Sequence, residues 1–526
     1  MNIKRNIFAL AAAALALSSC NKFLDEMPDN RTTLDTEDKV IALLVSAYPS
    51  APYFVTTEYY SDNVDETAIA NPDYDLLDDE LYHWQDVTDN GNDSPSSLWE
   101  GCYSAIASAN HALEAIPELP DTDRLRAARG EALLCRAFSH FLLVNTFCQA
   151  YDPAFAGDDL GVPYMDHAEK ELQTSYDRGS VAEVYAKIEK DIEEGLPLID
   201  DIIYTVPKYH FNSKAAYAFA ARFYLFYQKW DKAVECADKV LGTAPAGMLR
   251  DWKTNGEMQM QSADGKRLLR TEDYISHLHK CNLLLMTGYT QYGVAFGPYY
   301  ANTRFAHGNW LNNQETFEAS TAPWGRNCQP YSPPYTFNNG KGDKAFSWRV
   351  PYLFEYTDPV AQIGFAHSVT PVLTADETLL VRAEANIMLK NYDAAAEDMN
   401  LWVKNYCESG STLTPASITS WASNTEFYDP ARPTVKKRFD APTFTIEAGT
   451  QEAMCYAIVH MRRVETCHVG LRLFDVKRYG ITMTRRKLLH PEELAAVTGT
   501  LAPRDPRCAI QLPAEAIKAG MTPNPR

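Results

Sequence analysis

Apolar residues recur at every third or fourth position over long stretches of this chain, and that spacing constrains its fold more than any other feature. One stripe covers residues 98–116 and ends at Pro117, which does not continue a helix. A second covers residues 181–192 behind Ser180, a good N-cap residue, and residues 131–147 form a third, strongly apolar stretch. Helix follows helix with short connections and strand signals are sparse. The sequence therefore predicts a mainly α protein built from packed helix pairs.

Two places on the chain repeat the same short pattern of small and aromatic residues. Ala220–Arg222 leads into Trp230–Ala233, and Arg382–Ala385 leads into Tyr392–Ala395. Both resemble tetratricopeptide hairpins, in which alanines let two antiparallel helices approach closely and an aromatic residue fills the turn between them. The two copies stand about 160 residues apart, too far for a continuous array. We therefore expect a tetratricopeptide-like scaffold that a different kind of segment interrupts.

Residues 289–356 differ in composition from both flanks. They contain eight tyrosines and three tryptophans, where the average of the whole chain gives about five, and six prolines and six glycines break any long helix. Residues 53–100 are a smaller counterpart, with aromatic side chains among many Asp and Asn. The sequence thus predicts a single body over residues 46–526, with helical scaffold at about 98–285 and 360–480 and an aromatic, loop-rich insert at about 289–356.

The first twenty residues have the three-part layout of a secretory signal. Positive charge at Lys4 precedes a wholly apolar run over residues 7–17, and a Leu-Ser-Ser-Cys sequence ends at Cys20. That ending looks like a bacterial lipobox, whose cysteine is acylated before cleavage in front of it. We therefore expect residues 1–19 to be a lipoprotein signal peptide, Cys20 to be the lipidation site, and residues 20–45 to be a lipidated tether with a first helix. Two or three acyl chains, such as palmitate, anchor a protein durably to a membrane, whereas one chain holds only marginally.

The charge and the cysteine content exclude several classes of protein. A formal net charge of −20 argues against a nucleic-acid partner, which needs a basic face to replace counterions. Eleven cysteines include no Cys-x-x-Cys pair, so zinc-ribbon spacing is absent. Four of the cysteines lie in apolar helical patterns, and we expect these to be free, buried thiols: Cys102, Cys135, Cys148 and Cys236.

Both aromatic regions contain the residue types that sugar binding requires. Flat apolar faces suit the C–H surfaces of pyranose rings, and planar polar groups suit their hydroxyls. The candidate ligand-binding residues are Tyr82, Trp84, Tyr292, Tyr299, Asn302, Trp310, Trp324 and Arg326. The alternative interpretation is that the aromatic rings fill a small core of the insert itself.

No pattern in the sequence argues for catalysis or for a bound metal. Residues 86–92 match the start of a calcium loop, but Ser97 occupies the position that requires a bidentate glutamate. The acidic run at residues 73–80 contains enough carboxylates for a glycosidase pair, yet runs of this kind are usually solvated loops. The nucleophile-elbow, zinc-protease and Walker motifs are absent. We therefore expect a protein that is not an enzyme and that holds no metal and no cofactor.

Several short segments carry a resemblance when they are taken in series. They are Cys20–Asp25, Leu98–Trp99 with Tyr103 and Asn110, Gly130–Ala132, Arg136–Phe138, Leu160–Tyr164, Ser180–Val181 with Tyr185, Lys214–Ala216 with Ala221–Arg222, Ala383–Ala385 and Gly470–Gly480. In this order, over most of the chain, they resemble the RagB/SusD family of nutrient-uptake outer-membrane lipoproteins. The chain departs from the family pattern at Met461 and Val469, where glutamates are usual, and its end at Arg526 stops short of the usual Gln-Asn-Pro.

The resemblance implies a SusD-like fold, with a tetratricopeptide-like scaffold of helical hairpins and a loop-rich ligand-binding region. It implies a lipoprotein of the outer membrane that faces the exterior, captures oligosaccharides or polysaccharide, and delivers them to a SusC-like TonB-dependent transporter. Two alternatives remain open, a peptide-binding member of the same family and a tetratricopeptide-like scaffold without a ligand of its own. The ligand-contacting aromatics vary from member to member, so the resemblance does not select among the candidate residues.

Overall fold

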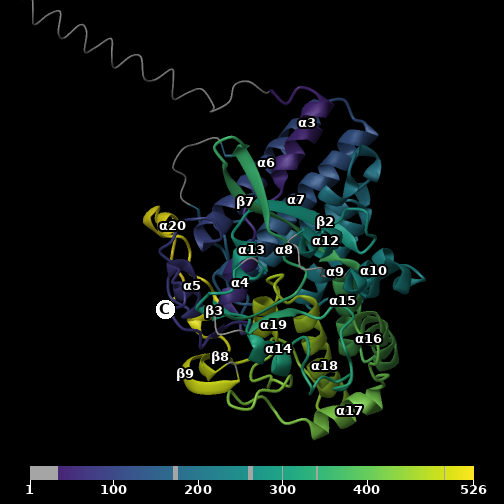
Figure 1. Ribbon diagram of the computed structural model, residues 1–526. Helices are drawn as coiled ribbons and strands as arrows, with labels where there is room; N and C mark the ends of the chain where they lie inside the picture. Colours follow the sequence, from purple (N-terminus) through teal and green to yellow (C-terminus); the bar gives the residue numbers. More distant parts are fainter. Residues whose placement is uncertain (1–32, 170–175, 259–264, 299, 339–341, 491) are drawn as a thin grey trace, which may run out of the picture.

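The computed structural model describes residues 33–526 apart from 170–175, 259–264, 299, 339–341 and 491. The predicted lipidation site Cys20 and the predicted ligand-binding residue Tyr299 lie outside the described residues. Within them the protein is mainly α, as predicted, and helix pairs make up most of the body (Figure 1).

The three apolar stripes are helices, and their ends lie close to the predicted places. α6 spans Pro95–Ala115 and gives way to a short 3-10 turn at Pro117. α7 spans Asp123–Phe147 and is buried along most of its length. α8 spans Val181–Gly195 and begins with a full capping box, because Ser180 and Glu183 each bond the backbone N–H of the other. α7 packs between α6 and α8, so the stripes face one another.

Both predicted hairpins are present. α9 (Ser213–Phe226) pairs with α10 (Trp230–Leu241), and α15 (Ala375–Met388) pairs with α16 (Tyr392–Tyr406). The two hairpins pack on each other through α10 and α15, although they are far apart in sequence (Figure 1). Arg222 on α9 donates to both carboxylate oxygens of Glu377 on α15, at 2.9 and 2.7 Å. This buried pair joins the hairpins into one scaffold.

Strands are more numerous than the sequence suggested. β2 (Asn282–Tyr289), β7 (Ile363–Thr374) and β6 (Leu353–Asp358) form an antiparallel sheet in the order β2-β7-β6. Parts of β2 and β7 fall in stretches predicted as helical scaffold. The cause is the run Leu283–Met286, which is buried on both faces of its strand, because a short continuous apolar run has no period that separates strand from helix.

A second sheet brings together segments from the two ends of the chain and from the insert. Its strands, in the order β3-β1-β8-β9, are Phe305–Ala306, Asp65–Glu66, Met483–His490 and Glu493–Leu501. β1 runs antiparallel to β3 and parallel to β8. A further hairpin of the insert joins β4 (Tyr335–Asn338) to β5 (Asp343–Phe346). The two-residue strand β1 therefore lies between the insert and the C-terminal hairpin.

The remaining elements are further helices, most of them short, and 3-10 turns. The α-helices are α3 (Glu37–Leu43), α4 (Phe54–Tyr60), α5 (Leu76–Tyr82), α11 (Trp252–Glu257), α12 (Gly265–Tyr274), α13 (Tyr292–Ala295), α14 (Asn309–Glu315), α17 (Pro415–Asn424), α18 (Thr450–Glu465), α19 (Arg472–Tyr479) and α20 (Ala514–Lys518). The 3-10 turns are Leu44–Ala47, Ile116–Glu118, Leu196–Leu198, Asp201–Ile203, Pro207–Tyr209, Pro245–Met248 and Pro506–Cys508.

The cysteines follow the predicted pattern and add one feature. Cys102, Cys135, Cys148 and Cys236 are free and buried, as predicted. Cys328 of the insert forms a disulfide with Cys407 at the end of α16, across 79 residues of sequence. Disulfides persist in oxidising compartments, so this bond suits an exported protein. Among the described residues no helix has the length and apolar character needed to cross a membrane.

Candidate functional site

Most of the predicted ligand-binding rings lie inside the protein. The buried rings are Tyr82, Trp84, Tyr292, Trp310 and Trp324. The indole N–H of Trp84 donates to the carbonyl of Tyr60 at 3.0 Å, and the guanidinium of Arg485 covers the ring at 4.3 Å from its centroid. Trp324 stacks on His460 at 5.0 Å. This burial agrees with the alternative interpretation, in which the rings fill a core, and direct contact between these rings and a ligand stays a prediction.

The other two described candidates have different surroundings. Arg326 is exposed, in the segment that leads to the disulfide at Cys328. Asn302 lies beside the loop at residues 71–73, where its side-chain amide donates to the carbonyl of Asn71 at 3.2 Å. The predicted residues therefore do not form one site. Asn302, however, lies beside a loop that lines a surface hollow.

A surface hollow of about 450 Å³ lies where three distant parts of the chain meet. It is lined by Glu66, Thr67, Ala68, Ile69, Pro72, Tyr74, Arg304, Lys487, Leu488 and Leu489. Tyr74 is 61% exposed, more than any other Phe, Trp or Tyr in the part of the chain that the structure describes. The hollow thus offers one accessible aromatic ring beside several charged groups.

Ion pairs hold the charged side chains of the hollow in place. Glu66 and Lys487 are opposite each other in the parallel pairing of β1 with β8, and their charged atoms are 3.3 Å apart. Arg304 reaches the same carboxylate oxygen of Glu66 at 3.0 Å and also contacts Asp79 at 3.2 Å. The hollow therefore presents a carboxylate, a guanidinium and an ammonium within a small area, and each of them can bond a hydroxyl group.

Backbone and side-chain hydrogen bonds fix the wall that carries Tyr74. The N–H of Asp73 donates to the carbonyl of Asn302 at 2.9 Å, and the N–H of Thr67 donates to the carbonyl of Arg304 at 2.9 Å. Below the hollow the hydroxyl of Tyr82 accepts from the N–H of Glu66 at 3.1 Å and donates to the carbonyl of Arg486 at 2.9 Å. Two of the predicted residues, Tyr82 and Asn302, thus position the site from beneath and from its rim.

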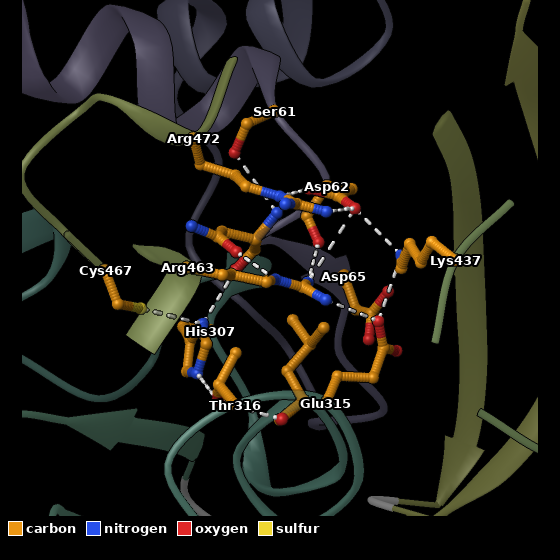
Figure 2. A network of polar contacts seen from close by, with 12 residues as sticks. Ser61, Asp62, Asp65, His307, Glu315, Thr316, Lys437, Arg463, Cys467 and Arg472 are labelled. Carbon is orange, nitrogen blue, oxygen red and sulfur yellow. Dashed lines mark hydrogen bonds and ion pairs between the residues drawn. The ribbon is translucent and has the colours of Figure 1, made fainter. Parts of the chain in front are cut away.

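A buried network of charged side chains lies beneath the sheet of β3, β1, β8 and β9 (Figure 2). Arg472 binds Asp62 through two hydrogen bonds of 2.7 and 2.9 Å, and Lys437 approaches the same carboxylate from the opposite side at 2.8 Å. Lys437 also lies 3.1 Å from Glu315 of the insert, and Arg463 on α18 donates to Glu315 at 3.0 Å. The network therefore ties the segment before β1, the insert and the C-terminal helices together.

The charges of this network compensate one another. Burial favours the neutral form of Glu315, but Arg486, Lys437 and Arg463 outweigh it and hold the pKa of this carboxyl at about 2. Burial acts in the same way on Asp62, and Arg463, Arg472 and Lys437 hold its pKa well below the ordinary value. Both acids are therefore charged at neutral pH, and the cations around them are needed for the fold.

The region that resembled a calcium loop is a turn with other partners. The carboxylate of Asp86 accepts from Arg526 at 2.5 Å, and Asp89 accepts from the N–H of Gly91 at 2.7 Å. Another group of possible metal donors, which no sequence pattern indicated, lies beside the buried network and consists of His307, Cys467 and His468.

Sequence reasoning missed Tyr74, Glu66, Arg304 and Lys487, although one signal was available. Tyr74 lies in a polar stretch, next to Asp73 and Asp75, whereas Tyr82 follows Leu77 and Leu81 on one helix. A ring in a polar stretch is more often exposed than a ring in an apolar stripe. The charged residues carry no such signal, because the sheet joins segments more than 180 residues apart.

A second hollow of about 460 Å³ lies along α6 and is a competing candidate. Its lining includes Trp99, Tyr103, Ile106, Met165 and Met521. The hydroxyl of Tyr103 donates to the carbonyl of Pro163 at 2.9 Å, so part of its polar capacity is already used. This groove is more apolar than the first hollow, although Glu100, Ser104, Asn110, His167 and Glu169 also line it.

The comparisons with known proteins agree on one family. The SusD-like family model described as starch-binding and associating with the outer membrane matches residues 22–225. No curated protein sequence matches the chain.

Solved structures extend the likeness to nearly the whole chain. A SusD superfamily protein from Bacteroides thetaiotaomicron has a TM-score of 0.60 at 17% identity, and the match covers 93% of this chain and 100% of that one. A SusD superfamily protein from Bacteroides vulgatus also has a TM-score of 0.60, at 18% identity over 93% of this chain and 98% of that one. A structure described as a laminarin-binding SusD-like protein has a TM-score of 0.56 at 17% identity, covering 93% and 99%. This chain therefore has a SusD-like fold, and its residues 22–225 match the SusD-like family model.

Proposed function

We propose that this protein binds oligosaccharides or polysaccharide at the hollow around Tyr74 and delivers them to a SusC-like TonB-dependent transporter in the outer membrane. The observation that carries the proposal is the exposed ring of Tyr74 beside Glu66, Arg304 and Lys487. An aromatic face stacks on the apolar face of a pyranose ring, and the charged groups bond its hydroxyls. The description of the family model and the laminarin-binding neighbour support a glycan as the ligand.

A binding panel tests the ligand class directly. The purified protein is run through gels that contain starch, laminarin or other polysaccharides, and affinities for matching oligosaccharides are measured by calorimetry. We expect at least one glucan to retard the protein. Tyr74→Ala should weaken that binding about tenfold or more, because the stacking platform is lost.

Tyr356→Ala is the matched control. Tyr356 is a tyrosine of similar exposure, 52%, but it lies on β6 and not in the hollow. Its replacement should leave the affinity unchanged. Equal losses in both variants, or no retardation by any glycan, would contradict the proposal. Peptides in the same panel test the alternative of a peptide ligand, whose apolar side chains fit the groove along α6 better.

We also propose that a lipid on Cys20 holds the protein at the outer membrane, facing the exterior, as the lipobox predicts. Cys20→Ala should release or mislocalise the protein while its affinity for the glycan in solution stays the same. Fractionation and surface proteolysis measure the first effect, and calorimetry measures the second. Co-purification of the transporter with the wild-type protein tests delivery. Failure to recover a transporter when glycan binding is intact would leave only the capture step.

A further inference from the structure

Three side chains that commonly bind transition metals meet in the protein interior. The donor atoms of His307, Cys467 and His468 all lie within 4.8 Å of one another. The sulfur of Cys467 is 3.8 Å from Nδ1 of His307, as the dashed line in Figure 2 shows. All three residues are buried. This cluster has no part in the glycan site proposed above.

His468 is the member that the protein leaves unexplained. Neither of its ring nitrogens has a hydrogen-bond partner among the described residues, although the side chain is fully buried. Its backbone adopts φ +65°, a left-handed conformation that costs free energy for a residue with a Cβ atom. A buried polar group without a partner is rare, and an ion is one of its ordinary explanations. The strained backbone holds the ring next to Cys467 and His307.

His307 is already oriented as a metal ligand would be. Its Nε2 lies 3.0 Å from the hydroxyl oxygen of Thr316, and that hydroxyl in turn contacts the carbonyl of Leu311 at 3.0 Å. When the hydroxyl of Thr316 donates to Leu311, its oxygen accepts the N–H of Nε2. In that tautomer of His307 the free lone pair is on Nδ1. Metal-bound histidines usually donate their other N–H in this way. Figure 2 shows the ring between Thr316 and Cys467.

A fourth donor is close to the same nitrogen. The carbonyl oxygen of Asn63 lies 3.0 Å from Nδ1 of His307. Neighbouring donor atoms around tetrahedral zinc are roughly 3.3–3.8 Å apart, given its bond lengths to nitrogen, oxygen and sulfur. The measured separations of 3.0 and 3.8 Å lie close to that range. The donor atoms of the three side chains all lie within 4.8 Å of one another, so the widest pair must come closer together when they bind one ion.

We propose that His307, Cys467 and His468, with the carbonyl of Asn63, bind a structural zinc ion. Thiolate and imidazole donors favour zinc over calcium or magnesium, which prefer oxygen ligands. The ion binds the Nδ1 lone pair of His307 and the carbonyl oxygen of Asn63, gives His468 its missing partner and binds the thiolate of Cys467. Because the ligands come from the segment before β1, from the insert and from the end of α18, the ion joins the same three parts as the buried charge network.

His460 shows why an unpartnered histidine alone does not make a site. It is also buried and has no hydrogen-bond partner on either ring nitrogen among the described residues. Its ring stacks on Trp324, as the ring of His468 stacks on Phe296, but no described cysteine or second histidine stands beside it in a donor cluster. His460 is therefore the matched control for His468, just as the buried free thiol of Cys455 on the same helix is the control for Cys467.

Metal analysis of the full-length, detergent-solubilised protein tests the proposal. After refolding with zinc and extensive dialysis, we expect about one zinc ion per chain by mass spectrometry. Refolding with cobalt(II) should give the thiolate-to-cobalt absorption that only a sulfur ligand produces. Cys467→Ser and His468→Gln should reduce bound zinc to background, whereas Cys455→Ser and His460→Gln should keep it. Thr316→Val should weaken zinc affinity about 10- to 100-fold, because it removes the partner of Nε2.

The cobalt spectrum of the wild-type protein decides the question even if the variants fail to fold. A protein that takes up no metal on refolding overturns the proposal. Metal that binds without the thiolate absorption, or that Cys467→Ser leaves in place, also overturns it, because such an ion sits elsewhere on the protein.

Discussion

Two ion pairs that are neighbours along the same two strands differ in the exposure of their cations. Asp65 and Arg486 form a buried pair at 2.7 Å, and Arg486 also contacts Glu315 at 2.7 Å. One residue further along, Glu66 and Lys487 form a pair at 3.3 Å at the edge of the surface hollow, where the lysine is 53% exposed. Side chains alternate between the two faces of a strand, so on β8 a step of one residue moves the cation from the interior to the surface, whereas the carboxylate of Glu66 stays 8% exposed.

The comparison separates charges that hold the fold from charges that are available to a ligand. The inner pair is joined to the buried network through Glu315 and cannot meet a ligand, although it combines an acid and a base as the outer pair does. The aromatic residues divide in the same way, since Trp84 is buried and Tyr74 is exposed. Residue type therefore identifies candidates for binding, and burial decides among them.

The largest expected effect comes from Arg486→Ala, which breaks the inner pair. Removal of one partner from a buried ion pair leaves uncompensated charge, and here both Asp65 and Glu315 lose a cation. We expect the free energy of unfolding to fall by about 3–5 kcal/mol, measured by denaturant titration. Lys487→Ala, one residue away, should change it by about 1 kcal/mol or less. Similar effects of the two substitutions would show that the inner and outer pairs do not differ as described.

A second prediction compares the loss of a buried ring, Trp84, with the loss of an exposed ring, Tyr74. Trp84→Ala should lower the free energy of unfolding by about 3–5 kcal/mol, because it empties part of the core and removes one of the two rings on which Arg485 packs. Tyr74→Ala should change it by about 0.5 kcal/mol or less, as is usual on the surface. A large loss of stability in Tyr74→Ala would mean that its effect on binding reports unfolding and not contact.

A third test uses a buried charge whose nearest partners are uncharged. Lys344 on β5 donates to the carbonyls of Val294 at 2.7 Å and Tyr300 at 2.9 Å. Burial lowers its pKa to about 7, so the unfolded chain, with an ordinary lysine, binds more protons than the folded protein between about pH 7 and 10.5. Stability should therefore rise with pH across this window by up to about 1.4 kcal/mol per unit. Denaturant titrations at several pH values should show that rise in the wild type and a flatter profile in Lys344→Met.

The smallest expected effect concerns the outer pair itself. Lys487→Ala removes one exposed hydrogen-bond donor from the hollow and leaves Tyr74 in place. We expect the affinity for a bound glucan to fall by less than about tenfold, measured by calorimetry. No change, together with a clear loss in Tyr74→Ala, would place the sugar on the aromatic side of the hollow only.

The helical part of the fold was predictable because its signals are local. The stripe at residues 181–192 and the N-cap at Ser180 lie within one helix, and the structure confirms both. The second sheet was not predictable, because β1 is only two residues long and its partners are hundreds of residues away. A strand of that length has no periodicity to detect.

The candidate site was predictable in region but not in residues. Residues 53–100 and the insert do contribute to the hollow, and Asn302 lies at its rim. The predicted ligand-binding rings Trp84 and Trp310 lie against the buried arginines Arg485 and Arg486. That packing depends on tertiary contacts, which the spacing of residues in the sequence does not reveal.

A crystal structure of the protein with a bound oligosaccharide from the polysaccharide that retards it tests the central claim most directly. We predict that a sugar ring lies flat against Tyr74 and that its hydroxyls bond Glu66, Arg304 or Lys487. A ligand seated in the groove along α6, or against Arg326, with the hollow around Tyr74 free of sugar, would contradict the assignment of the site.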